Sequence, residues 1–182
     1  MDANKILKRL LDGNLEYMDA KRNHLGDISK EIREKTHHHG QNPIACCICC
    51  SDSRVIPEKI FMVGIGDLFV IRVAGNVLDN YGIASLEYAI CHLNIKLVMV
   101  LGHTKCGAIG ATIHNEGGKY INYLVEDIKK SIGNEEDMTK ASILNVKGVV
   151  NKINDLNIKP NNEIKVVGAI YHTLSGKVDI IS

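Results

Sequence analysis

The sequence predicts a single α/β domain built on a mostly parallel sheet with flanking helices. Four short apolar runs alternate with longer segments in which apolar residues recur at helical spacing. This alternation is typical of buried parallel strands covered by helices on both faces. The length of 182 residues, without an internal repeat or a low-complexity linker, fits one domain.

The predicted elements follow one another in a regular order. Residues 3–20 form an amphipathic helix in this prediction, because Ile6, Leu10 and Leu15 fall on one stripe. A polar stretch from about residue 21 to 42 follows, and we expect its run His37-His38-His39 to lie in a solvated loop. Buried strands are then predicted over residues 44–50, 68–73, 97–101 and 164–171, with helices over 83–93, 108–114, 120–132 and 138–156.

The composition argues against several classes of protein. The 22 basic and 21 acidic side chains leave a formal charge of +1, which does not favour a binder of nucleic acid or of a membrane surface. No apolar run approaches the roughly 20 residues of a membrane span. The first residues also lack the basic and then apolar layout of a signal peptide. We therefore expect a cytoplasmic protein with neither nucleic acid nor membrane as a partner.

Cysteine is unusually frequent in a chain that has no tryptophan and two phenylalanines. Four of the six cysteines lie within residues 46–50. In a reducing compartment such residues are expected to be buried, catalytic or bound to metal rather than paired in disulfides. Because side chains alternate across a strand, Cys46, Cys47 and Cys49 cannot converge on one metal ion. We assign these three, together with Cys91, to the core.

Reactive side chains follow two of the predicted strands. Cys50 ends the first strand, and Asp52 and Arg54 come next; His103 and Cys106 follow the third strand. Two thiolates and one imidazole suit zinc and leave a fourth position open, as in catalytic zinc sites. Asp52 could occupy that position, or Arg54 could hold the carboxylate away from it in a bidentate pair. Both arrangements are compatible with the sequence.

These segments resemble the β-class carbonic anhydrases. The resemblance is carried by Cys50-Ser51-Asp52-Ser53-Arg54, by His103-Thr104-Lys105-Cys106-Gly107 and by the intervening Gly66-Asp67-Leu68-Phe69-Val70-Ile71-Arg72. It covers the chain from about Asn14 to the C-terminus. Joined together, these motifs are far more specific than an isolated His-x-x-Cys.

The resemblance implies a fold, a cofactor and a reaction. The fold would be a four-stranded parallel sheet in the order 2-1-3-4 with an added antiparallel strand. One carbonic-anhydrase-like domain would span residues 1–182, with a helical arm (1–40) that embraces a partner subunit and a zinc-binding core (41–182). Cys50, His103 and Cys106 would hold one Zn2+ per subunit, with Asp52 and Arg54 as the catalytic pair. The reaction would be reversible hydration of carbon dioxide to bicarbonate and a proton, by attack of zinc-bound hydroxide, in a homodimer or a dimer-based tetramer.

The resemblance also implies residues that line the substrate cleft. Gln41, nine residues before Cys50, matches the family's glutamine, and Phe69 and Tyr88 match its aromatic pair. Cys47 stands where bicarbonate-inhibited members carry tryptophan, which favours the form in which Asp52 leaves the zinc accessible. Val73 stands where many members carry asparagine, a difference that bears on the hydrogen bonds beneath the site and not on zinc ligation.

Two other functions remain as alternatives. The same scaffold and metal could hydrolyse carbon disulfide or carbonyl sulfide, and the ligand residues do not separate these substrates from carbon dioxide. A non-catalytic, zinc-regulated binding protein is the second alternative. Retention of Asp52 and Arg54 argues against it, because a protein without catalysis has no need of the pair.

Overall fold

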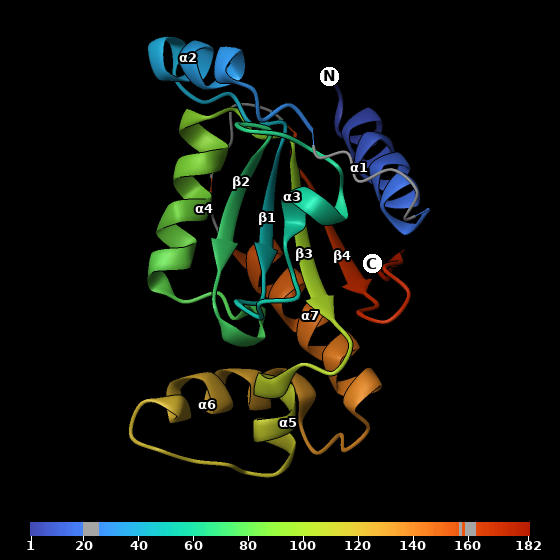
Figure 1. Cartoon of the computed structure of the whole chain (residues 1–182). Coiled ribbons are helices and arrows are strands. Elements are labelled where there is room, and N and C mark those ends of the chain that lie inside the picture. Colours follow the sequence, from blue (N-terminus) through green and yellow to red (C-terminus); the bar gives the residue numbers. More distant parts are fainter. Residues whose placement is uncertain (20–25, 157, 159–162) are drawn as a thin grey trace.

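A five-stranded sheet forms the centre of the protein (Figure 1). The structure is a computed structural model that describes residues 1–19, 26–156, 158 and 163–182. The strands lie in the order β2-β1-β3-β4-β5; the first four are parallel and β5 is antiparallel to β4. Their bounds are β1 Ala45–Cys49, β2 Leu68–Arg72, β3 Leu97–His103, β4 Lys165–Tyr171 and β5 Val178–Ile180. The predicted fold class and strand order are confirmed.

Helices cover both faces of the sheet. The described helices are α1 Ala3–Met18, α2 Lys30–His39, α3 Pro57–Ile60, α4 Asn80–His92, α5 Gly107–Ile113, α6 Ile121–Ile132 and α7 Met138–Asp155, with a short 3-10 turn at Ala74–Asn76. One core cluster joins α1 and α3 to one face of the sheet, and a second joins α4 and α7 to the other. Among the described residues, no helix has the length and apolar character needed to cross a membrane.

Strand β1 explains three of the cysteines. Cys47 and Cys49 face the α1 side of the sheet, whereas Cys46 faces the α4 and α7 side, as the alternation of side chains requires. All three are at most 2% exposed, and burial raises the pKa of Cys46 to about 12. Cys91 is half-buried and packs against the second cluster. The assignment of these cysteines to the core is confirmed.

Helix α1 packs against its own chain through a buried polar residue. Asn14, which is 2% exposed, donates from Nδ2 to the carbonyls of Ile60, at 3.2 Å, and Gly176, at 2.8 Å. Its Oδ1 accepts the backbone N–H of Val178 at 2.8 Å. One amide group therefore joins α1 to α3 and to the connection between β4 and β5, and every polar atom of the buried side chain has a partner.

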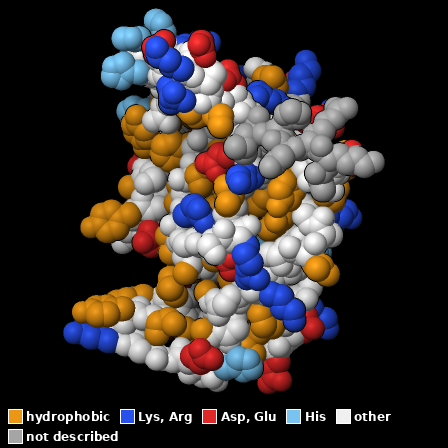
Figure 2. Space-filling view, viewed as in Figure 1, with side chains coloured by type: hydrophobic (Ala, Val, Ile, Leu, Met, Phe, Trp, Pro, Cys, Tyr) orange, Lys and Arg blue, Asp and Glu red, His pale blue; other side chains and the backbone are white. Residues whose placement is uncertain are grey.

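The prediction that the histidine run lies in a loop is wrong. His37, His38 and His39 form the last turn of α2 and are exposed, as the pale-blue group at the top of Figure 2 shows. The Ser29 side chain caps this helix by accepting the N–H of Ile32 at 3.2 Å. The helix buries no residue, so it has no apolar stripe by which periodicity could predict it. Residues 20–25 of the predicted polar stretch lie outside the described residues.

A third apolar cluster lies beneath the carboxyl ends of the strands. There α5, α6 and α7 meet below the sheet (Figure 1), and the cluster contains Cys50 and Cys106 together with Val77, Ile109, Ile128, Ile132 and Ala141. The two cysteines of the predicted metal site therefore sit on a packed apolar floor rather than in a mobile loop. This floor limits the access of water from below.

Candidate metal centre

Two adjacent parallel strands bring three ligand-type side chains together. β1 and β3 are neighbours with Cys49 opposite Leu101, so Cys50 and His103 emerge at the same edge of the sheet. Cys106 follows His103 at the N-cap of α5. The ligand atoms of Cys50, His103 and Cys106 all lie within 4.8 Å of one another. All three residues are buried, with exposures of 4%, 1% and 1%.

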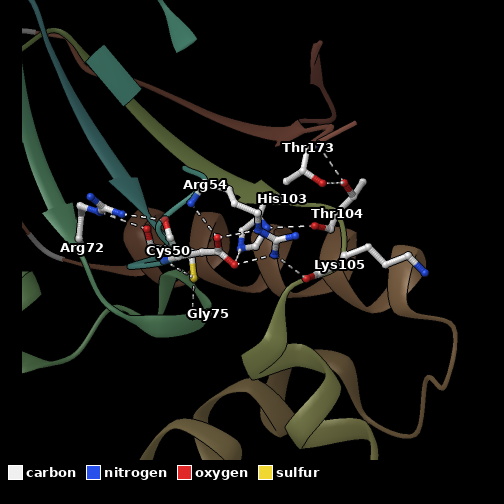
Figure 3. A network of polar contacts seen from close by, with 9 residues as sticks. Cys50, Arg54, Arg72, Gly75, His103, Thr104, Lys105 and Thr173 are labelled. Atoms are coloured by element: carbon white, nitrogen blue, oxygen red, sulfur yellow. Dashed lines mark hydrogen bonds and ion pairs between the residues drawn. The ribbon is translucent and has the colours of Figure 1, made fainter. Parts of the chain in front are cut away.

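The imidazole of His103 is oriented for a ligand. Its Nδ1 lies 3.0 Å from the carbonyl oxygen of Thr104, which can only accept, so Nδ1 carries the proton and Nε2 keeps its lone pair (Figure 3). Nε2 is buried and has no hydrogen-bond partner among the described residues. A buried polar atom without a partner is costly, whereas a metal ion would satisfy it.

Hydrogen bonds favour the thiolate form of Cys50. The side chain of Cys106 and the backbone N–H groups of Gly75, at 3.2 Å, and Asp52, at 3.4 Å, surround its sulfur. These contacts, led by the one with Cys106, outweigh desolvation and lower the pKa of Cys50 to about 4. The same pairing raises the pKa of Cys106, because the two sulfurs compete for one proton. Thiolate is the form that binds a metal.

The donor set fits zinc. Two cysteine sulfurs, one of them already favoured as thiolate, and one imidazole lone pair are the softer ligands that zinc accepts in tetrahedral sites. A cluster held together by hydrogen bonds alone would not leave the buried Nε2 of His103 without a partner, whereas a bound metal ion would account for it. Three protein ligands leave one position for water or substrate.

Asp52 is held by Arg54. Arg54 Nε donates to Oδ1 at 2.9 Å and Nη2 to Oδ2 at 2.7 Å, and the backbone N–H of Arg54 also reaches Oδ1 at 2.9 Å. Arg54 holds the pKa of the Asp52 carboxyl well below its usual range. Oδ2 still lies 3.9 Å from Nε2 of His103, so the carboxylate borders the centre. Of the two arrangements predicted, the structure shows the pair with Arg54.

Arg72 is a contributor to the site that sequence reasoning did not single out. From the end of β2 it donates to the carbonyls of Cys50, at 3.2 Å, and Asp52, at 3.0 Å (Figure 3). It thereby fixes the backbone on both sides of Ser51. The sequence carried one sign of this role, which is that Arg72 stands at the end of a predicted strand. In the structure that strand pairs with β1, and Arg72 lies opposite Cys49.

The predicted cleft residues lie elsewhere in the chain. Gln41 is exposed and precedes β1, at the end of the strand opposite to Cys50. Phe69 pairs with Cys46 near the start of the strands, about 13 Å from Cys50 at the rise of a β-strand. Its ring centroid lies 6.2 Å from that of Tyr88, which stacks on His92. Within one chain these three residues do not meet the metal ligands.

The spacing Cys46-x-x-Cys49 does not form a redox pair. Three residues along a strand reverse the side of the sheet, and the two side chains belong to opposite core clusters. Among the described residues none of the six cysteines forms a disulfide. Of the cysteines in this segment, the metal-binding chemistry is therefore confined to Cys50, which follows the strand.

Comparison with known proteins gives a consistent result. A family model described as carbonic anhydrase matches residues 45–178. The carbonic anhydrase of Mycolicibacterium smegmatis is 31% identical over 96% of this chain and 91% of its own length. The solved β-carbonic anhydrase of Coccomyxa, in complex with acetazolamide, superposes with a TM-score of 0.72 at 27% identity, over 96% of this chain and 86% of that one. A tetrameric β-carbonic anhydrase of Sordaria macrospora shares the fold, with a TM-score of 0.62 at 22% identity over 84% of this chain and 91% of its own. With the family model, a relative over nearly the whole length and the observed fold in agreement, the chain belongs to the β-carbonic anhydrase family.

Proposed function

We propose that this protein catalyses the reversible hydration of carbon dioxide to bicarbonate and a proton, with one zinc ion held by Cys50, His103 and Cys106. The observation that carries the proposal is the convergence of three buried ligand atoms within 4.8 Å, one of them an unpartnered imidazole nitrogen. Zinc bound there would supply a Lewis acid that activates water at neutral pH.

Asp52 is the residue that would orient the nucleophile. Its low pKa keeps the carboxylate ionised at neutral pH, so it can only accept hydrogen bonds. From a position 3.9 Å from the lone pair of His103 it can accept the proton of a water molecule beside the centre. A water held in this way presents a lone pair toward the carbon of the substrate.

Arg54 would keep Asp52 in that role. Its two side-chain hydrogen bonds occupy both carboxylate oxygens, and its Nη2 also donates to the carbonyl of Lys105 at 3.1 Å. The guanidinium therefore links the segment after β1 to the segment after β3. Without this clamp the carboxylate would be free to turn toward the metal and compete with substrate for the open position.

Gln41, Phe69 and Tyr88 would line the substrate cleft of a partner subunit. Their separation from the ligands within one chain supports this arrangement, because only a second copy can bring them to a metal centre. Exposed apolar side chains gather along the edge of the molecule formed by α4 and α6, where Figure 2 shows a hollow. Tyr81, Tyr88, Tyr120 and Tyr123 contribute to the exposed set, with exposures of 85%, 46%, 70% and 73%. A homodimer or a dimer-based tetramer would cover them.

The organisation and location of the protein are part of the proposal. Residues 1–182 would form one domain, with 1–40 as the N-terminal arm and 41–182 as the zinc-binding core. The buried contacts of α1 with its own chain mean that such an arm would reach a partner by its outer face. A cytoplasmic location agrees with six cysteines outside disulfides, because a reducing compartment preserves such thiols.

A stopped-flow assay of the zinc-loaded protein tests the function. Carbon dioxide hydration followed by a pH indicator should be rapid and should disappear when a chelator removes the metal. Negligible hydration of carbon dioxide with rapid hydrolysis of carbon disulfide or carbonyl sulfide would favour the alternative reaction. Inactivity on all three substrates, with zinc retained, would favour the zinc-regulated binding protein.

A further inference from the structure

A buried hydrogen-bonded chain connects helix α7 to a predicted metal ligand. The side chain of Asn145 donates from Nδ2 to the carbonyl of Gly75 at 2.8 Å, and the N–H of Gly75 donates to Sγ of Cys50 at 3.2 Å. Asn145 is 2% exposed and Gly75 is buried, so water does not replace either contact. This series of hydrogen bonds connects residues far apart in sequence and reaches the Cys50 sulfur from the side of α7.

The backbone of Gly75 is constrained both by its own conformation and by the side chains packed against it. It adopts a left-handed backbone conformation, with φ +68°, which favours glycine. A Cβ at this position would lie 2.7 Å from Cδ1 of Ile128 and 3.1 Å from Cβ of Ala108, so the backbone is packed tightly against α5 and α6. Substitution of Gly75 would therefore disturb packing, whereas substitution of Asn145 can remove one hydrogen bond and leave the glycine in place.

The other backbone N–H that reaches the Cys50 sulfur comes from its own loop. The N–H of Asp52 is fixed by Arg72, which binds the carbonyls on both sides of Ser51. Val73, next to the turn, packs against the apolar cluster and offers no side-chain hydrogen bond. Among the contacts described, Asn145 thus makes the one side-chain hydrogen bond to Gly75.

We propose that Asn145 is a positioning residue for the metal centre. By holding the Gly75 carbonyl it aims the Gly75 N–H at Cys50, and this hydrogen bond withdraws electron density from the thiolate and fixes its direction. Asn145 therefore sets the donor strength of one ligand and the rate at which the metal is lost. The inference rests on the ligand set in the proposed function.

Cobalt substitution gives a readout that activity does not. Co2+ bound by thiolates has a sulfur-to-metal charge-transfer band in the near ultraviolet. Loss of an N–H···S hydrogen bond raises the energy of the sulfur lone pair and moves that band to longer wavelength. Asn145→Leu, which keeps the number and branching of the side-chain heavy atoms and removes the donor, and Asn145→Ala should both show this shift. Because the sulfur is then no longer held in its direction, zinc should be bound about 10-fold less tightly, the lower end of the usual effect of outer-shell partners, and should be transferred correspondingly faster to a colorimetric chelator.

Ser142→Ala is the matched control. Ser142 lies one helical turn earlier on the same buried face of α7, and its hydroxyl donates to the carbonyl of Met138 in the same helix at 2.8 Å. This variant should keep the wild-type band and the wild-type rate of zinc transfer. Circular dichroism and thermal melting establish which variants fold; if Asn145→Leu does not, Asn145→Ala decides.

The outcomes separate this inference from the ligand assignment. Folded Asn145 variants with an unchanged band and unchanged zinc release would overturn it, even if they melt at a lower temperature, because Asn145 would then only stabilise the fold. A wild-type protein without any thiolate-to-cobalt band would instead overturn the assignment of Cys50 and Cys106 as ligands, and the inference with it.

Discussion

The two ends of the parallel sheet differ in how complete they are. At the carboxyl ends of β1 and β3 one chain supplies three ligand-type atoms within 4.8 Å of one another, with a carboxylate beside them that an arginine holds. Toward the amino ends lie Gln41 and the ring pair of Phe69 and Tyr88, outside the group of ligand-type side chains that the structure brings together. A single chain can therefore build a metal centre, whereas the substrate cleft that we propose would need a second copy. The predictions below test this division.

Removal of a ligand at the carboxyl end should have the largest effect. Cys106→Ser should lose zinc and carbon dioxide hydration together, because a serine hydroxyl does not replace a thiolate donor. Zinc content by atomic emission and stopped-flow rates provide the two measurements. As a control, Cys47→Ala changes a core cysteine of β1. It should retain zinc and lower the free energy of unfolding by about 1 kcal/mol. Normal hydration by Cys106→Ser would refute the ligand assignment.

Loss of the carboxylate should separate metal binding from catalysis. Asp52→Asn should retain one zinc per chain, because its side chain is held by Arg54 and not by the ligand cluster. Its rate of hydration should fall by about 10²–10⁴-fold, the usual contribution of a positioned proton acceptor. Zinc content and kcat/KM measured on the same sample make the comparison. A variant with wild-type kcat/KM would show that Asp52 is dispensable.

The division between the two ends can be tested by mixing defective subunits. We expect Tyr88→Ala to lower kcat/KM about 10-fold through loss of cleft contacts. Co-expression with Asp52→Asn, each chain carrying a different affinity tag, yields mixed dimers. If the cleft is shared, one site in each mixed dimer is intact, so its activity should exceed the mean of the two parents. Activity equal to that mean would place the cleft within one chain and would contradict the proposed interface.

The smallest effect should come from a helix cap whose described hydrogen bond involves neither the predicted metal ligands nor the predicted cleft residues. Asp79 accepts the N–H of Gly82 at 2.7 Å and caps α4, the helix that carries Tyr88. Asp79→Ala should lower the free energy of unfolding by about 1 kcal/mol, measured by urea denaturation, and leave zinc binding unchanged. Loss of zinc in this variant would mean that the cap of α4 is coupled to the metal centre more strongly than its contacts indicate.

Most of the fold could be predicted, because its strands and buried helices carry strong apolar patterns. Alternation of side chains excluded a shared metal ion for Cys46, Cys47 and Cys49, and the apolar character of free cysteine assigned them to the core. Helix α2 could not be predicted in this way because none of its residues is buried. The bounds of β3 were also short by two residues, since Gly102 and His103 lack the apolar character of the preceding run.

The sequence could predict which side chains meet at the ends of β1 and β3, but not the residues that support them from other elements. Cys50 and His103 meet because parallel neighbouring strands end at one edge, a relation that topology provides. The contacts of Arg72 depend on the register of β2 against β1. That of Asn145 depends on the rotation of α7 beneath the sheet, across 70 residues of sequence. Neither register nor rotation is encoded in a local pattern, so these partners emerged only with the structure.

The buried amide of Asn14 has a consequence for the order in which the protein can be assembled. Its three hydrogen bonds reach Ile60, Gly176 and Val178, so two of them span 162 and 164 residues. During synthesis the helix at residues 3–18 emerges long before those partners do. Two of the hydrogen bonds of Asn14 must therefore wait until Gly176 and Val178 have left the ribosome. Contacts between distant parts of a chain also slow folding, so we expect the docking of this helix to be a late step, after the sheet has formed.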